Sequence, residues 1–318
     1  MATVFQTDFA WPDVEIEHAV IQGAGHTLIT GPSEALQPER IEALVAEHEP
    51  EAIMTCWAEV SAKAIALPAR LAIVQRIGVG LDNIAVEAAT ARGAWVANVP
   101  DYCVEEVSDH AVAMIMGWLR GIVSFDREVK TGRWNPAAAQ LRRATNLTVG
   151  ILGYGRIGRA SARKLSGIGL TVLAHDIAPF PEFGAAHLVD MEELLARSDV
   201  ILVHLPLTSD TKHLVGADFL SQMRVGSLLV NVSRGPIVDS EALIYALESG
   251  PLAGAALDVV EGEPDPPENL VARADVIVTP HVAFSSDASL AELRRRSAEE
   301  VVRVLAGGSP EHPCNSPL

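Results

Sequence analysis

Three polar side chains that could transfer a proton and bind an anion follow buried, strand-like runs of the sequence. Arg234 comes directly after SLLVNVS, Glu263 comes soon after LAGAALDVV, and His281 directly follows VIVTP. A histidine beside a carboxylate can release and take up a proton near neutral pH, and the planar guanidinium of arginine pairs with a carboxylate in bidentate fashion. Singly, such an arginine is usually a surface group and such a histidine a packed one. Because parallel strands end at one edge of a sheet, the three together predict a site for a small acid.

A glycine-rich motif predicts a dinucleotide site in the same part of the chain. Residues 153–158 read GYGRIG, between the strand-like LTVGIL and the helix-like RIGRASARKLSGIGL. Gly153 would permit the tight turn, Gly155 would let the backbone approach a pyrophosphate, and Gly158 would allow close helix–strand packing. The following helix would present its first N–H groups to that anion. The alternative interpretation is a glycine turn without a ligand.

The next strand-like run, TVLAHD, ends at Asp176, which lies 23 residues after Gly153. Its carboxylate could accept hydrogen bonds from an adenosine ribose. A 2′-phosphate would be repelled there, and no arginine directly follows Asp176 to receive one. The sequence therefore favours NAD over NADP.

Strand-like and helix-like segments alternate along the whole chain. One series closes with the NVP of residues 98–100, and a second begins at Leu147 and ends with VIVTPHV. The runs of the second series show little polar alternation, as expected of parallel strands that are covered on both faces. A long apolar-periodic helix is expected over residues 107–132, where His110 would be a core or interface group, and an amphipathic helix is expected over residues 288–308.

Composition sets the broad class of protein. A length of 318 residues suggests about two domains, and 49% apolar against 20% charged residues excludes a mainly disordered chain. The formal charge of −17 disfavours nucleic acid and anionic membranes as partners. No secretory signal or membrane span is visible, the three cysteines lie far apart, and no histidine or acidic cluster suggests a metal. We therefore expect a soluble, cytoplasmic protein without a metal site.

The motifs, taken in order, resemble the D-2-hydroxyacid dehydrogenase family. NVSRG, DVVEGEP and TPH follow GxGxxG, and RIGVGLDN precedes it near residue 76. RIGVGLDNIAVEAATARGAWVANVPDYCVEEVSDH and PHVAFSSDASLAELR are similar to the C-terminal-binding-protein-like branch of the family. The resemblance implies NAD-dependent interconversion of a 2-oxo acid and a D-2-hydroxy acid.

The resemblance also implies a role for each matching residue. Arg234 would bind the substrate carboxylate and polarise the C2 oxygen. His281 would be the acid in reduction and the base in oxidation, and Glu263 would favour its charged form. Asp258 would contact the nicotinamide end of the cofactor, and Asp176 its adenosine ribose. The remaining residues of the implied cofactor shell are Tyr154, Arg156, Ile157, His204, Leu205, Pro206, Val232 and Ser233.

For the substrate, the resemblance implies a loop in the N-terminal part of the chain. The N–H groups of Gly78-Val79-Gly80 would surround the substrate carboxylate, and Val79 stands where the branch often has a hydroxyl residue. Arg76 would meet a second anionic or polar group, with a strand-end salt bridge as the alternative. Phe284 stands where the corepressor members carry a tryptophan, and it would supply an apolar wall.

We therefore expect an α/β protein with two doubly wound parallel-sheet domains and an active site in the cleft between them. A Rossmann nucleotide domain would span residues 100–286. A flavodoxin-like substrate domain would be discontinuous and combine residues 1–99 with 287–318. The resemblance implies a homodimer formed through the nucleotide domain and the long helix.

Two other functions fit the same motifs. The first is a corepressor-like scaffold that uses NAD to set its oligomeric state, since corepressors keep the residues equivalent to Arg234, Glu263 and His281. The second is a dehydrogenase that acts on formate or phosphite, although Arg76 and its loop suit a larger organic acid.

Overall fold

The computed structural model describes residues 1–178 and 184–317. It divides into two compact units: the first combines Met1–Tyr102 with Ser286–Leu318, and the second is Cys103–Ser285. Each unit contains one sheet, and every pair of neighbouring strands within both sheets is parallel. The two doubly wound α/β sheets that the alternating pattern predicted are confirmed.

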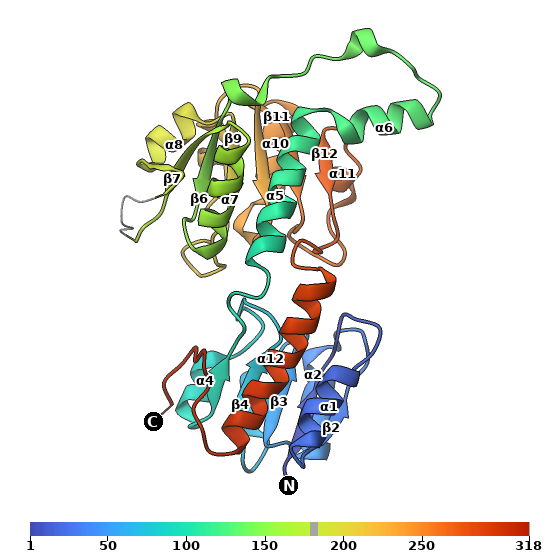
Figure 1. The fold of residues 1–318 in the computed structure, drawn as a ribbon, viewed down its shortest axis with the longest axis vertical. Coiled ribbons are helices and arrows are strands. Elements are labelled where there is room, and N and C mark those ends of the chain that lie inside the picture. The colour runs from blue at the N-terminus through green and yellow to red at the C-terminus, as the bar shows by residue number, and fades with distance from the viewer. Residues whose placement is uncertain (179–183, 318) are drawn as a thin grey trace. The chain divides into compact units, whose positions relative to one another are not determined.

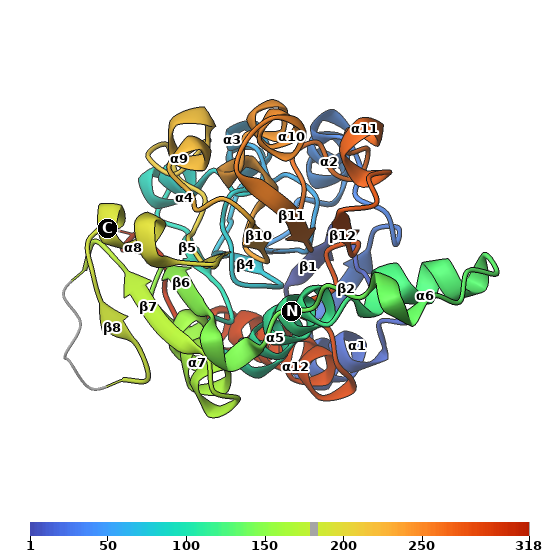
Figure 2. The same ribbon diagram turned by 90° about the horizontal axis from the view of Figure 1, so that it is seen from above.

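The first unit has a five-stranded sheet in the order β2-β1-β3-β4-β5. Its strands are β1 (Thr3–Gln6), β2 (Thr27–Thr30), β3 (Ala52–Thr55), β4 (Ile73–Arg76) and β5 (Trp95–Ala97). Its helices are α1 (Glu15–Gly23), α2 (Pro38–His48), α3 (Ala62–Ala66), α4 (Val86–Ala91) and α12 (Asp287–Leu305). In Figure 2, α1 and α12 lie side by side on one face of the sheet, and α2, α3 and α4 cover the other.

The second unit has a seven-stranded sheet in the order β12-β11-β10-β9-β6-β7-β8. Its strands are β6 (Thr148–Leu152), β7 (Thr171–His175), β8 (His187–Leu188), β9 (Val200–Val203), β10 (Ser227–Asn231), β11 (Leu252–Leu257) and β12 (Val276–Val278). The chain runs outward from β6 to β8 and then returns to place β9 on the other side of β6. The order therefore reverses between β6 and β9, and parallel sheets bind ligands beyond the carboxyl ends of the strands at such a point.

Helices cover both faces of this second sheet. The helices of this unit are α5 (Val104–Leu119), α6 (Ile122–Lys130), α7 (Arg156–Gly167), α8 (Met191–Arg197), α9 (Ala217–Ser221), α10 (Ser240–Glu248) and α11 (Glu268–Val271), and all but α6 cover the sheet. Helices α5 and α7 lie side by side on one face (Figure 1). The apolar side chains of α8 to α11 join those of the strands in one core on the other face. Strands β9 and β10 are buried along their whole length, and each fully buried leucine or valine contributes roughly 1.5–3 kcal/mol.

The prediction of a single long helix over residues 107–132 is wrong, because two helices occupy this stretch. Helix α5 ends at Leu119 and α6 begins at Ile122, with Gly121 between them at a φ of 63°. Only glycine adopts this left-handed conformation without strain, and it ends the run of helical hydrogen bonds. The apolar periodicity continues across the break and therefore hides it. Helix α6 extends beyond the end of α5 (Figure 1) and has no buried residue.

Candidate functional site

The glycine turn joins β6 to α7, and the N–H of Gly153 donates to the carbonyl oxygen of His175 at the end of β7. Gly153 has a φ of 98°, and a Cβ there would lie 2.6 Å from the carbonyl oxygen of His204. A Cβ on Gly158 would lie 2.2 Å from the carbonyl oxygen of Gly153, whereas one on Gly155 would meet nothing within 4 Å. The first and third glycines therefore let the backbone pack closely. The middle one leaves open space in front of the N-terminus of α7, where an anion can approach.

Asp176 is fixed at this turn by backbone donors. Its Oδ2 accepts a hydrogen bond from the N–H of Tyr154 at 2.7 Å, and its Oδ1 accepts one from the N–H of Ala178 at 2.9 Å. Each carboxylate oxygen can still accept a further hydrogen bond, as a ribose hydroxyl would require. The ring of Tyr154 is buried, so this residue offers its backbone at the turn.

His204, at the end of β9, has its side chain turned toward α7. Its Nε2 lies 2.9 Å from Oγ of Ser161, and burial lowers the pKa of His204 to about 3. The imidazole is therefore neutral at physiological pH and cannot serve as the proton donor of the site. The backbone of His204 packs against Gly153, and its role near a cofactor stays a prediction. Sequence analysis did not identify Ser161, a small polar residue in an otherwise ordinary helical pattern.

The side chains of His281 and Glu263 meet, as their sequence positions predicted, and their role as an acid–base pair stays a prediction. Nδ1 of His281 lies 2.9 Å from Oε1 of Glu263. The two residues lie on the loops that follow β11 and β12, which are neighbours in the sheet. The ring of Phe284 meets that of His281 edge-on, with centroids 6.2 Å apart. Because Nδ1 faces Glu263, Nε2 is the ring nitrogen that can face a substrate.

Asp258 lies behind the loop that carries His281. Asp258 is buried, with an exposed fraction of 2%. Its carboxylate accepts hydrogen bonds from the N–H groups of Val282 and Ala283 and from the hydroxyl of Thr279. The predicted contact of Asp258 with a nicotinamide stays a prediction, whereas this holding role was not foreseen from the sequence.

The loop that carries Arg234 is shaped by the buried side chain of Asn231. Its Oδ1 accepts from the N–H and the hydroxyl of Ser233, and its Nδ2 donates to the carbonyl oxygen of Arg234 at 2.9 Å. Gly235 packs so tightly that a Cβ would lie 2.3 Å from the carbonyl carbon of Val260. The Arg234 loop is thus held against the loop that leads to Glu263. Asn231 is a further residue of the site that sequence analysis missed, although it opens the NVSRG motif.

In the first unit, Arg76 is directed into its own loop. The residue is 5% exposed, and its guanidinium donates to the carbonyl oxygens of Gly80, Ile77 and Thr55. It also lies over the ring of Trp57, 5.8 Å from the centroid. These bonds run to backbone carbonyl oxygens and not to the carboxylate of a strand-end salt bridge, and contact of Arg76 with a substrate stays a prediction. Arg76 shapes the loop of residues 77–80.

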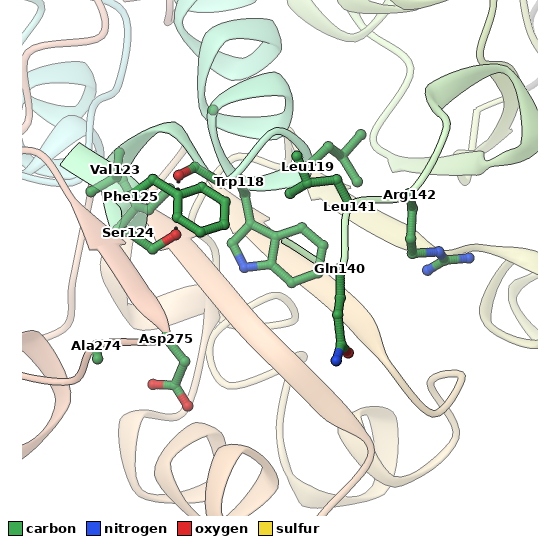
Figure 3. Close-up of a pocket in the computed structure, with 13 residues that line it drawn as sticks. Trp118, Leu119, Val123, Ser124, Phe125, Gln140, Leu141, Arg142, Ala274 and Asp275 are labelled. Atoms are coloured by element: carbon green, nitrogen blue, oxygen red, sulfur yellow. Dashed lines mark hydrogen bonds between the residues drawn. The ribbon is translucent and has the colours of Figure 1, made fainter. Parts of the chain in front are cut away.

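A cavity of about 270 Å³ lies at the amino-terminal end of β12, in the second sheet (Figure 3). Trp118 and Leu119 from the end of α5, Phe125 from α6, and Leu141 line it. Asp275 also lines it and precedes β12, whereas His281 follows that strand. The cavity is therefore separate from the edge that carries the glycine turn and the His281–Glu263 pair.

Within residues 1–178 and 184–317, no group of three or more His, Cys, Asp or Glu side chains is placed to hold a metal ion. None of the helices in the described ranges combines the length and the apolar character needed to cross a membrane.

Comparison with known proteins identifies the family. Residues 112–283 match the family described as D-isomer specific 2-hydroxyacid dehydrogenase, NAD binding domain. The chain is 37% identical over 254 residues to a glyoxylate reductase of Korarchaeum cryptofilum, covering 77% of this chain and 76% of the relative. This chain belongs to the D-isomer specific 2-hydroxyacid dehydrogenase family.

Two solved structures resemble the entire fold. One is a D-lactate dehydrogenase from Aquifex aeolicus complexed with NAD and lactic acid, at 26% identity, TM-score 0.85 and 96% coverage of both chains. The other is an NADPH-dependent glyoxylate/hydroxypyruvate reductase from Sinorhizobium meliloti, at 29% identity and TM-score 0.85, covering 98% of this chain and 96% of that one. The protein is thus an NAD-dependent oxidoreductase that interconverts a 2-oxo acid and a D-2-hydroxy acid.

Proposed function

We propose that His281 is the acid–base group of this reaction, that Glu263 supports it and that Arg234 binds the substrate carboxylate. The observation that carries the proposal is the 2.9 Å contact between His281 Nδ1 and Glu263 Oε1. The pair lies on loops at the carboxyl edge of the sheet, which also carries the glycine turn. The open space at Gly155 fits a pyrophosphate at this edge.

When bound, the nicotinamide supplies the hydride in reduction and accepts it in oxidation. In reduction, His281 donates the proton at Nε2 to the C2 oxygen of the oxo acid, and in oxidation the same nitrogen takes that proton back. The carboxylate of Glu263 stabilises the positive charge that His281 carries before the donation. Arg234 orients the acid through paired hydrogen bonds to its carboxylate.

We propose that the first unit is the substrate-binding domain and that the substrate is a small 2-oxo acid. The loop of Gly78-Val79-Gly80 offers backbone N–H groups to an anion, and Arg76 keeps that loop in shape. In the second unit, Phe284 supplies an apolar wall beside His281. The relatives reduce glyoxylate or hydroxypyruvate or oxidise lactate according to their names, so we expect acids of two or three carbons to be accepted.

We propose NAD as the preferred cofactor over NADP. The carboxylate of Asp176 is held at the turn by the N–H of Tyr154 and would repel a 2′-phosphate. The next two residues, Ile177 and Ala178, bring no positive charge to offset it. Binding titrations that follow the fluorescence of NADH and NADPH test this preference. Equal affinity for the two would contradict it.

We propose a homodimer that forms through α6 and the segment after it. The exposed fractions of Ile122, Val129 and Trp134 are 61%, 47% and 82%, an unusual apolar display for a monomer. Leu141 and Trp118 line the cavity beside this segment (Figure 3), which a second copy of the chain could fill. Sedimentation should give twice the monomer mass, and Trp134→Glu should shift it toward the monomer. A wild-type monomer at micromolar concentration would refute the proposal.

We also propose a cytoplasmic location. All three cysteines are free thiols, as is usual in a reducing compartment. Fractionation of the native cells, with the chain detected by antibody, tests this location.

The decisive test of the activity is NADH oxidation in the presence of glyoxylate, hydroxypyruvate, pyruvate and bulkier 2-oxo acids. Turnover that is lost in His281→Ala supports the proposal. No turnover with any acid, together with tight binding of a peptide, would support a corepressor-like scaffold instead. Turnover only with NAD and formate or phosphite would indicate a dehydrogenase that acts on formate or phosphite.

A further inference from the structure

A line of hydrogen bonds connects helix α5 to the segment that carries His281. Nε2 of His110, on α5, lies 2.9 Å from Oγ1 of Thr279, which lies 2.6 Å from Oδ1 of Asp258. The hydroxyl has one hydrogen and a carboxylate only accepts, so Thr279 donates to Asp258. His110 must therefore donate to Thr279 through Nε2–H. The three residues come from α5, the end of β11 and the end of β12.

Asp258 transmits this anchoring to the backbone of residues 281–283. Its Oδ1 accepts from the N–H of Val282 at 3.0 Å, and its Oδ2 accepts from the N–H of Ala283 at 2.9 Å. The N–H of His281 itself donates to the carbonyl oxygen of Asp258 at 2.8 Å. Three consecutive amides thus bind one nearly inaccessible residue, so they cannot shift independently of it.

His281 depends on such anchoring because of its backbone conformation. Its φ is 53°, in the left-handed region that non-glycine residues rarely adopt. If the segment relaxed toward an ordinary conformation, the imidazole would turn away from Glu263, which it meets at 2.9 Å. The position of the ring therefore depends on hydrogen bonds made several residues away from it.

We propose that His110 and Thr279 are positioning residues for the reaction: through Asp258, they hold the segment 279–283 in the conformation that aligns the His281 ring with Glu263. This inference rests on the proposed function, in which His281 exchanges the proton with the substrate. His110 acts from a helix outside the sheet edge, so the alignment of the acid–base group depends on the packing of α5 against the sheet.

The first arm of the test measures hydrogen exchange by mass spectrometry in a peptide that covers residues 279–285. Thr279→Val and His110→Leu remove the hydrogen bonds, whereas Thr279→Ser and His110→Gln keep a donor of similar reach. We expect faster exchange at the amides of Val282 and Ala283 in the first pair and wild-type exchange in the second. Unchanged exchange in both disrupting variants would overturn the inference.

The second arm measures steady-state reduction of a 2-oxo acid by the same four variants. We expect kcat to fall about tenfold or more in Thr279→Val and His110→Leu, since small displacements of a reacting group are costly. KM and the Kd of NADH should stay unchanged, and Thr279→Ser and His110→Gln should restore kcat. The melting temperature, measured in parallel, separates this effect from general loss of folding.

The two arms distinguish the possible failures. A normal kcat with faster exchange, or a rise in KM and NADH Kd in place of a fall in kcat, would overturn the positioning role. If the wild-type protein reduces no 2-oxo acid, the proposed function fails. The exchange comparison then still decides whether His110 and Thr279 hold the segment.

Discussion

Nδ1 of His281 lies 2.9 Å from Oε1 of Glu263, and this contact joins the loops after two neighbouring strands, β11 and β12. A carboxylate in this position fixes the ring so that Nε2 faces away from Glu263. We expect the two side chains to act as one unit, and this expectation defines the first prediction.

Glu263→Gln should keep the ring in place and weaken the charge stabilisation. We expect kcat for reduction to fall by about 10- to 100-fold, and His281→Asn to lower it by about 10²- to 10⁴-fold. The double variant should be no slower than His281→Asn alone, because the two residues act together. Fully additive losses would show that Glu263 acts independently of His281.

The glycine turn offers a matched pair of substitutions. A methyl group on Gly155 meets nothing within 4 Å, so Gly155→Ala should keep the melting temperature. The methyl would occupy the space in front of α7 and raise the Kd of NADH about tenfold, which corresponds to 1.4 kcal/mol. In Gly158→Ala the methyl meets a carbonyl oxygen at 2.2 Å, and stability should fall by about 1–3 kcal/mol. NADH titration and urea unfolding check the two effects, and an unchanged Kd in Gly155→Ala would contradict the site.

Substitution of Arg76 distinguishes a structural role of this residue from a role in binding the substrate. Arg76→Met would leave buried carbonyl oxygens of its loop without their donor and should destabilise the protein by about 1–3 kcal/mol. The exposed Arg70 serves as the control, and Arg70→Met should change stability by less than about 0.5 kcal/mol. Urea unfolding measures both. A normal stability combined with a raised KM would assign Arg76 to the substrate instead.

His204 should make stability depend on pH in a definite direction. Burial lowers its pKa from 6.5 to about 3, so the folded protein keeps it neutral where the unfolded chain already binds a proton. The stability that depends on a neutral His204 is therefore fully present above pH 6.5 and is lost as the pH falls toward 3. The free energy of unfolding falls by up to about 1.4 kcal/mol per pH unit over this range. The stability difference between wild type and His204→Gln should shrink from pH 7 to pH 5. The exposed His187→Gln should show no such trend, and a constant difference for His204→Gln would refute the assignment.

The sequence was sufficient to predict those features that depend on local pattern. Unbroken apolar runs predicted the parallel strands, and the spacing of glycines predicted the turn at residues 153–158. Residues at the ends of β11 and β12 were expected to meet, because parallel strands share an edge, and His281 and Glu263 do so. The family and the NAD-dependent activity followed from these motifs, whereas the branch within the family stays a prediction.

Side-chain hydrogen bonds between distant segments could not be predicted in the same way. His110 and Thr279 are 169 residues apart, and nothing in either local pattern indicates that they are partners. The inward turn of Arg76 depends on loop carbonyl oxygens that a sequence does not orient. The break at Gly121 was missed because a glycine inside an apolar pattern can continue a helix or end it, and its left-handed φ decides which.

We propose that His281 exchanges the proton while the glycine turn holds the cofactor. The most direct measurement compares wild type with His281→Asn for NADH binding and for single-turnover reduction of glyoxylate. We predict equal NADH affinity and a hydride-transfer rate that is lower by at least about 100-fold in the variant. A His281→Asn variant that reduces glyoxylate at the wild-type rate would show that another group exchanges the proton.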